Sequence, residues 1–166
     1  MAALRRSELT ALTVDQVAEH PNSLVLAIVR SKTNQTGERA ELAVLPRARM
    51  ASRCPVTTLQ TWLTATGIAH GPVFRAASTG NRAGPRAMNP SSVNVLVQQA
   101  TVRANLEPAA YSALSLRAGF VTYANLRGAS DRAIAHQTRH RSLATLGQYV
   151  RVAQAWDDNA ATQLGL

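Results

Sequence analysis

The hydrophobic pattern of this chain changes at residue 54, and that change limits the folds open to it. Before residue 54, the apolar run that starts at Leu24 is strand-sized and rich in β-branched residues, and residues 39–45 alternate roughly between polar and apolar. After residue 54, apolar residues recur at helical spacing. We therefore predict an α+β domain that is mostly helical, with a small three-stranded antiparallel sheet.

The predicted elements fall into two groups. The first group forms the sheet and its hairpin, and consists of a helix at 7–12, strands at 14–17, 24–30 and 39–45, and a turn at 34–37. The second group is helical, with helices starting at residues 55, 90, 115, 130 and 142. Residues 71–86 are rich in glycine and proline, which predicts a loop around a short strand at 73–74.

Length and composition exclude several classes of protein. The 166 residues suffice for one domain, and 46% hydrophobic with 16% charged residues excludes a disordered chain or a coiled coil. No apolar run approaches the roughly 18 residues of a membrane span, and residues 1–20 carry charges that break any signal-peptide core. The single cysteine, Cys54, excludes an internal disulfide, and we expect it to be buried. We expect a cytoplasmic protein.

The charge balance points to a polyanionic partner. Eighteen basic residues stand against nine acidic ones, so the formal net charge is +9. This balance favours nucleic acid over an acidic membrane. Seventeen of the basic residues are arginine, and the one lysine is Lys32. Codon bias explains why lysine is scarce but not why a single lysine remains, so Lys32 is a candidate functional residue.

Five motifs, spread along nearly the whole chain, match those of a known family in order and spacing. The segment Arg5–Leu9 matches an Arg-x-x-Glu-Leu helix, and Lys32 lies on the predicted hairpin. Leu114–Arg117 matches part of a His-x-x-Arg motif, and His140 matches the histidine of a Gly-His motif. Tyr149 follows nine positions later, where the family has its nucleophile. The chain thus resembles the catalytic domain of the tyrosine recombinases, or phage-type integrases.

The resemblance implies a site-specific DNA recombinase or integrase. Tyr149 would be the nucleophile, assisted by Arg5, Lys32, Arg117 and His140. The partner would be double-stranded DNA, on which the family assembles as a tetramer, although the isolated chain could be a monomer. The resemblance implies neither a metal nor a nucleotide cofactor, and no membrane partner. It also implies a bacterial or phage origin and association with the nucleoid.

The chemistry of these residue types agrees with such a reaction. Cutting a phosphodiester without a metal requires cations around the transition state, and arginine forks donate paired hydrogen bonds to phosphate oxygens. A tyrosine of pKa about 10 must lose its proton as it attacks. A lysine can return a proton to the departing 5′-oxygen. The covalent 3′-phosphotyrosyl link conserves the bond energy, so rejoining needs no ATP.

The chain departs from the family pattern at three places. Leu114 stands where the family usually has histidine, and leucine cannot accept a proton; losing one acid–base group costs about 10²- to 10⁴-fold in rate. Arg139 replaces the usual glycine before His140. We expect residues 1–166 to be a single, N-terminally truncated catalytic domain that lacks the family's DNA clamp domain. The tail Trp156–Leu166 packs either on its own core or on a neighbouring protomer.

Several alternatives remain open at this stage. The chain could be a catalytically impaired DNA-binding remnant or accessory protein of the same fold, as Leu114 suggests, or an enzyme similar to type IB topoisomerases. It could also be a basic protein whose motif residues do not converge in space. Tyr111 and Tyr123 are rival tyrosines, and we expect Tyr123 to lie in the core. His136 and His140 are spaced like a metal pair, but the sequence shows no third ligand.

Overall fold

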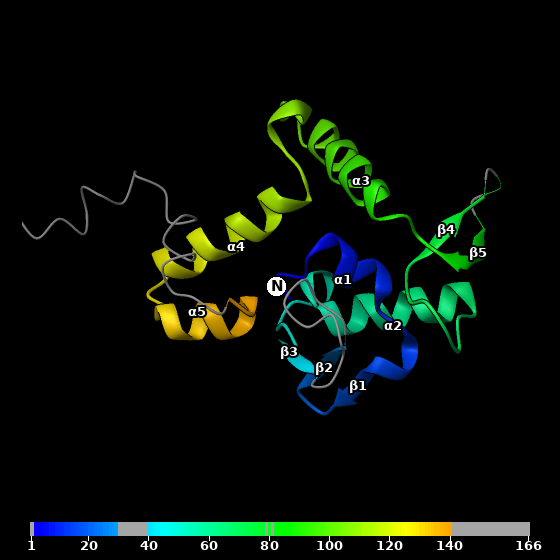
Figure 1. The fold of residues 1–166 in the computed structure, drawn as a ribbon, viewed down its shortest axis with the longest axis horizontal. Coiled ribbons are helices and arrows are strands. Elements are labelled where there is room, and N and C mark those ends of the chain that lie inside the picture. Colours follow the sequence, from blue (N-terminus) through cyan, green and yellow to red (C-terminus); the bar gives the residue numbers. More distant parts are fainter. Residues whose placement is uncertain (1, 30–39, 79, 81, 141–166) are drawn as a thin grey trace, which may run out of the picture.

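The computed structural model describes residues 2–29, 40–78, 80 and 82–140, in which helices surround a three-stranded antiparallel sheet (Figure 1). The elements are α1 (Arg6–Ala11), β1 (Val17–His20), β2 (Ser23–Ile28), β3 (Glu41–Pro46), α2 (Pro55–Thr66), β4 (Arg75–Ala77), β5 (Ala83–Ala87), α3 (Pro90–Arg103), α4 (Ala113–Leu126) and α5 (Asp131–Thr138). The predicted fold class is confirmed. The predicted turn at 34–37 and the predicted helix from residue 142 lie outside the described residues.

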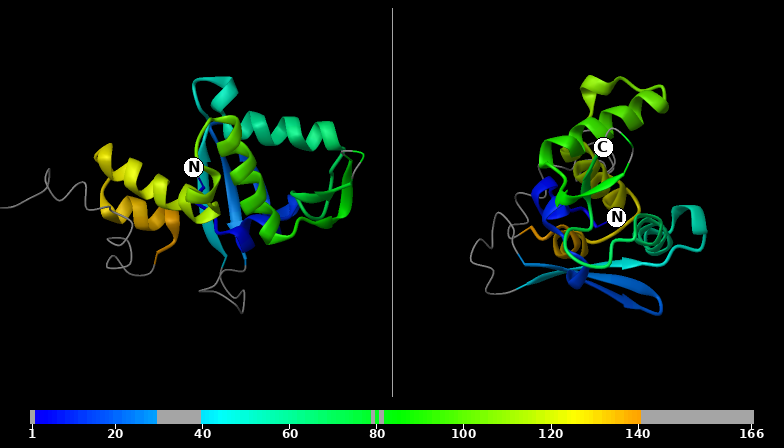
Figure 2. Two further views of the ribbon diagram at one scale, coloured as in Figure 1. Left: turned by 90° about the horizontal axis from the view of Figure 1, so that it is seen from above. Right: turned by 90° about the vertical axis from the view of Figure 1, so that its right-hand side faces the viewer.

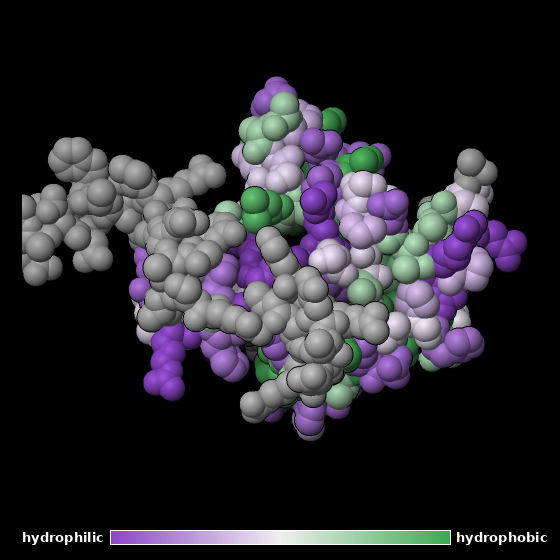
Figure 3. All heavy atoms as spheres, in the orientation of Figure 1, coloured by the Kyte–Doolittle hydropathy of each residue, from purple (hydrophilic) through white to green (hydrophobic). Residues whose placement is uncertain are grey.

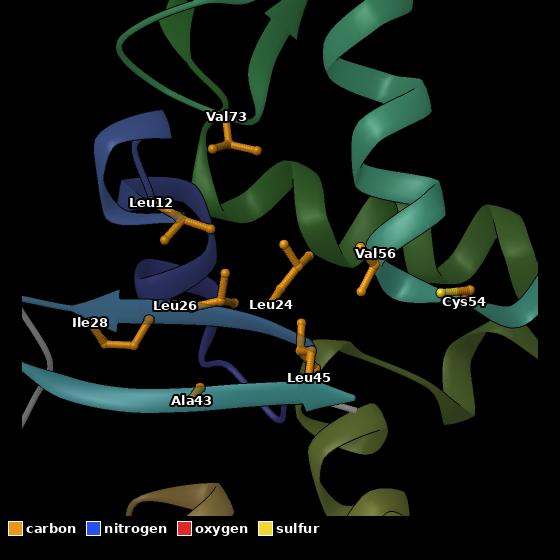
Figure 4. Packing of buried hydrophobic residues seen from close by; sticks show 9 residues of the cluster. All are labelled: Leu12, Leu24, Leu26, Ile28, Ala43, Leu45, Cys54, Val56 and Val73. Carbon is orange, nitrogen blue, oxygen red and sulfur yellow. The ribbon is translucent and has the colours of Figure 1, made fainter. Parts of the chain in front are cut away.

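The main sheet has the strand order β1-β2-β3, and one of its faces carries the larger hydrophobic core. Leu24 and Leu26 on β2 alternate with half-buried neighbours, and Leu45 on β3 is directly opposite Leu24. Figure 4 shows these side chains on the face of the sheet that meets α1 and α2, where Val56 is fully buried. This alternation is what a sheet with one covered face requires.

Helix α5 covers the free edge of the sheet. Strand β3 is an edge strand, and the Gln137 side-chain amide of α5 donates to the Val44 carbonyl at 2.9 Å. Helices α4 and α5 lie side by side in the views of Figures 1 and 2 and bury a second, smaller cluster that contains Val121 and Ile134. Capping the edge strand in this way satisfies a backbone group that would otherwise face solvent.

Local sequence explains where the helices begin and end. Gly67 follows α2 in the left-handed conformation with φ +65°, and its N–H closes the helix. The Ser130 hydroxyl accepts from the Ala133 N–H at the start of α5, as the sequence predicts for an N-cap. At the start of α4, the Ser112 N–H donates to the Ser115 hydroxyl at 3.0 Å.

Three local predictions were wrong. The strand predicted at 14–17 is mostly a 3-10 turn, and β1 begins only at Val17. The segment 71–86, predicted as a loop around a strand at 73–74, instead contains β4 and most of β5, which pair with each other; Val73 lies before them, buried, with its N–H bonded to the Leu12 carbonyl at 2.9 Å. Tyr123 is 66% exposed, because α4 turns Arg117 and Val121 inward and leaves Tyr123 on its other side.

Within the described residues, no helix has the length and apolar character needed to cross a bilayer. The face shown in Figure 3 is largely hydrophilic, with apolar side chains in small separate groups over α3 and α4.

Candidate functional site

The site is built around a buried carboxylate at the start of the chain. Glu8 lies one turn into α1, and its side chain is fully buried. It accepts the Arg5 backbone N–H at 2.8 Å and also forms an ion pair with the Arg5 guanidinium. Burial raises the pKa of Glu8, but hydrogen bonds from Arg5 and the charges of Arg139 and Arg5 outweigh it, so the pKa is lowered overall. Glu8 is therefore ionised and fixes the guanidinium of Arg5.

Arg117 enters the same region from α4. It is buried, and its two terminal nitrogens donate to the carbonyl oxygens of Ala3 and Thr138. These two acceptors belong to segments 135 residues apart in sequence (138 − 3), so one guanidinium joins the start of the chain to the end of α5. Such anchoring fixes the plane of the guanidinium.

His140 lies directly beside Arg117. Its Nε2 is 3.2 Å from Arg117 Nη2, and its Nδ1 is 2.6 Å from the Thr138 hydroxyl oxygen. Because a guanidinium only donates, Nε2 must be the acceptor and Nδ1 must carry the proton. The Thr138 hydroxyl then donates onward to the Ile134 carbonyl at 2.7 Å. This chain of hydrogen bonds holds the imidazole in one tautomer.

The surroundings of His140 oppose a positive charge on the ring. Burial, followed by the charges of Arg117, Arg5 and Arg139, lowers the pKa of His140 to about 4. The imidazole is therefore neutral at pH 7. The three arginines are joined by shared acceptors, because Arg5 and Arg139 both bind Glu8, and Arg139 and Arg117 both reach the Ala3 carbonyl.

Arg139 is a fourth basic residue of this cluster. It adopts the left-handed conformation with φ +56°, and its side chain is only 3% exposed. Its Nη2 donates at 2.9 Å to Glu8 Oε2, the oxygen that also accepts the Arg5 backbone N–H, and Nη1 donates to the Gln137 carbonyl at 2.9 Å. The left-handed conformation explains why glycine would suit this position. The structural role of Arg139 was not predicted from the sequence, which marks it only as a replacement for the usual glycine.

Three of the five predicted site residues come together in the structure: Arg5, Arg117 and His140. The other two, Lys32 and Tyr149, lie outside the described residues. Leu114 lies one turn before Arg117 on α4 and is 58% exposed.

The structure adds little support for a metal site or for a reactive cysteine. In the described part of the chain, no three His, Cys, Asp or Glu side chains are grouped to ligate a metal ion. Cys54 is buried, as predicted, and hydrogen bonds from Thr57 lower its pKa to about 7. It belongs to the main hydrophobic cluster and lies outside the arginine-rich site.

Comparison with known proteins gives one curated relative and several related structures. No protein-family model matches the chain. It is 29% identical over 162 residues to a protein of Selenomonas ruminantium named integrase/recombinase XerD homolog, covering 98% of this chain and 47% of the relative. The chain therefore spans about half the length of that protein.

Solved structures share the fold. A crystal structure of XerA recombinase superposes with a TM-score of 0.68 at 19% identity, covering 98% of this chain and 53% of that one. A post-cleavage complex of XerH site-specific recombinase bound to palindromic difH substrate gives a TM-score of 0.71 at 16% identity, covering 99% and 42% respectively. At these identities, the likeness establishes the fold.

Proposed function

We propose that this chain, which is related to the tyrosine recombinases and has the fold of their catalytic domains, is the catalytic domain of a site-specific DNA recombinase or integrase. The observation that supports this best is the meeting of Arg5, Arg117 and His140. They come from segments far apart in the sequence, and a basic protein without a site has no reason to gather like charges there. One of the solved structures with this fold is a recombinase bound to its DNA substrate.

In this proposal the arginines bind the scissile phosphate. The side chain of Arg5 is 24% exposed and its guanidinium is held by Glu8, while Arg117 is held by backbone carbonyls. Both are therefore oriented before DNA arrives and need little reorganisation as negative charge develops on the phosphate oxygens. His140 adds a neutral imidazole, which can donate a hydrogen bond once its ring contacts rearrange around the phosphate.

The reaction consists of two exchanges of a phosphate ester. The Tyr149 oxygen forms a bond to phosphorus as the bond to the 5′-oxygen breaks, and Lys32 donates a proton to that departing oxygen. The tyrosine proton passes to solvent, since leucine at position 114 cannot accept it. Attack by a 5′-hydroxyl on the phosphotyrosine then reverses these steps and rejoins the strands. Partial exposure of Leu114 leaves room for water at that position.

One observation favours a second function. Leu114 is a large, exposed apolar side chain at a position where the family pattern has an acid–base group. A chain with the arginine cluster but without that group fits a DNA-binding remnant or accessory protein of the same fold. In both cases we propose double-stranded DNA as the partner, with self-association on DNA.

Covalent trapping separates the two functions. Nicked duplexes selected for binding from a randomised pool would be incubated with four versions of the protein: the unchanged chain, Tyr149→Phe, Leu114→His and the double variant. A band resistant to SDS that disappears with Tyr149→Phe supports the enzyme. A band seen only with Leu114→His supports the impaired remnant. Binding with no band in any version contradicts the proposed catalytic function.

A further inference from the structure

We propose that Arg139 is a positioning residue, which couples the β2–β3 hairpin to the arginine and histidine centre through Glu41. The inference rests on the proposed function and gives a role to the arginine that stands in place of the glycine of the Gly-His motif. The structure places Arg139 in contact with the start of the chain and with the first residue of β3, and its backbone continues directly into His140.

The first contact is with the start of the chain. Arg139 Nη2 donates to Glu8 Oε2 at 2.9 Å, and Glu8 in turn binds Arg5. The two terminal nitrogens also reach the carbonyls of Ala2 and Ala3 at 3.3 Å. The Ala3 carbonyl is shared with Arg117. A shift of Arg139 would therefore displace Glu8 and the Ala3 carbonyl, which hold Arg5 and Arg117, the two proposed phosphate-binding arginines.

The second contact is with the hairpin. Glu41 is the first residue of β3, where the connection that contains Lys32 enters the sheet. Its Oε2 lies 4.0 Å from Arg139 Nε. Both atoms are buried and lack a hydrogen-bond partner among the described residues. A buried donor and acceptor that face each other without bonding are costly, and a movement of about 1 Å would pair them.

The third contact is covalent, because His140 follows Arg139 directly. Arg139 occupies a left-handed position at the end of α5, and its Nη1 bonds back to the Gln137 carbonyl. The adjoining Gln137 side chain holds β3 through Val44. Closure of the Arg139–Glu41 gap on DNA binding would fix strand β3 relative to Arg5 and His140. Misplacement of a reacting group by about 1 Å costs up to about 100-fold in rate.

The decisive variant is Glu41→Gln, because Glu41 is partly exposed and stands apart from the buried Glu8. In single-turnover cleavage of a nicked duplex selected from a randomised pool, we expect adduct formation to slow by about 10- to 100-fold, with DNA affinity and melting temperature unchanged. Arg139→Lys should slow it at least as much, because it also disturbs the bonds to Glu8 and to the Ala2 and Ala3 carbonyls. Adding Glu41→Gln to Arg139→Lys should cost less than Glu41→Gln costs in the unchanged chain, because the contact between the two residues is already lost. Glu19→Gln, which breaks the exposed Glu19–Arg47 pair on the same sheet, is the matched control.

A second measurement does not depend on cleavage. In the Tyr149→Phe variant bound to the same duplex, the Arg139 Nε–H resonance should shift downfield and become protected from exchange, and Glu41→Gln should abolish this change. No shift on DNA binding would refute the coupling. A shift accompanied by unchanged cleavage in Glu41→Gln would refute the positioning role. If the chain binds the duplex but forms no adduct, the catalytic proposal fails, and the Nε–H resonance still tests the coupling between Arg139 and Glu41. If the chain does not bind DNA, the catalytic proposal and the coupling are both refuted.

Discussion

At the scale of single residues, His140 links the electrostatics of the site to stability. Its pKa is lowered from 6.5 to about 4 in the folded protein. Between these pH values the unfolded chain binds the proton and the folded chain does not, so the stability of the fold falls as the pH drops through this window. Urea unfolding at several pH values should show this loss, and His140→Gln should reduce it. An NMR titration of His140 near 6.5 would contradict the account.

Arg117 should be a structural as well as a functional residue. It is the donor for two carbonyls from distant segments, and lysine cannot serve both acceptors and His140 at once. We expect Arg117→Lys to lower the free energy of unfolding by about 2 kcal/mol, because buried acceptors lose their partner. Arg127→Lys, at the exposed end of the same helix, is the control and should change stability little. Equal effects from both variants in urea unfolding would count against the network.

The site residues illustrate what a sequence can reveal about a buried network. Arg5, Arg117 and His140 were predicted from motif order, and the structure brings them together. Arg139 was noted only as a substitution for glycine, since its partners Glu8 and Glu41 lie about a hundred residues away in sequence. No local sequence pattern predicts contacts between residues that far apart in the chain. Lys32 and Tyr149 remain predictions.

At the scale of elements, the two glycines Gly67 and Gly119 allow a matched test of helix termination. Gly67 adopts φ +65° after α2, whereas Gly119 lies inside α4, and a Cβ added at either glycine would meet no other atom within 4 Å. Gly67→Ala should therefore cost about 1 kcal/mol from backbone strain alone. Gly119→Ala should stabilise the protein by about 0.5–1 kcal/mol. Thermal unfolding of the two variants measures both changes in stability. Destabilisation by Gly119→Ala would show that residue 119 does not lie in a regular helix.

Elements with strong periodicity were predictable, and the weak hairpin was not. Strands β2 and β3 are short apolar runs of strand length, and α2 ends at the predicted glycine. The β4–β5 pair consists of alanine, glycine, arginine and proline, residue types with little preference for strands. Its pairing depends on tertiary context, such as the hydrogen bond from the Met88 N–H to the Phe74 carbonyl at 2.9 Å.

At the scale of the whole molecule, the net charge of +9 should dominate affinity for DNA of arbitrary sequence. Binding of a basic protein releases counterions, so raising salt from about 50 to 200 mM should weaken the affinity for a random duplex by about 10-fold or more. Tyr149→Phe removes no charge and should leave the salt dependence unchanged. Fluorescence anisotropy measures the DNA affinity of the unchanged chain and of Tyr149→Phe at each salt concentration. An affinity that does not depend on salt would exclude phosphate contacts as its source.

The most direct test of the central claim uses a duplex whose scissile phosphate is replaced by a methylphosphonate, which removes one charged oxygen. If Arg5 neutralises that oxygen, Arg5→Ala should slow adduct formation by about 10³-fold on the ordinary phosphate. On the methylphosphonate, the same variant should lose less than about 10-fold, because the charge to be neutralised is gone. Equal losses on both substrates, or no Tyr149-dependent adduct on either, would contradict an arginine-centred recombinase site.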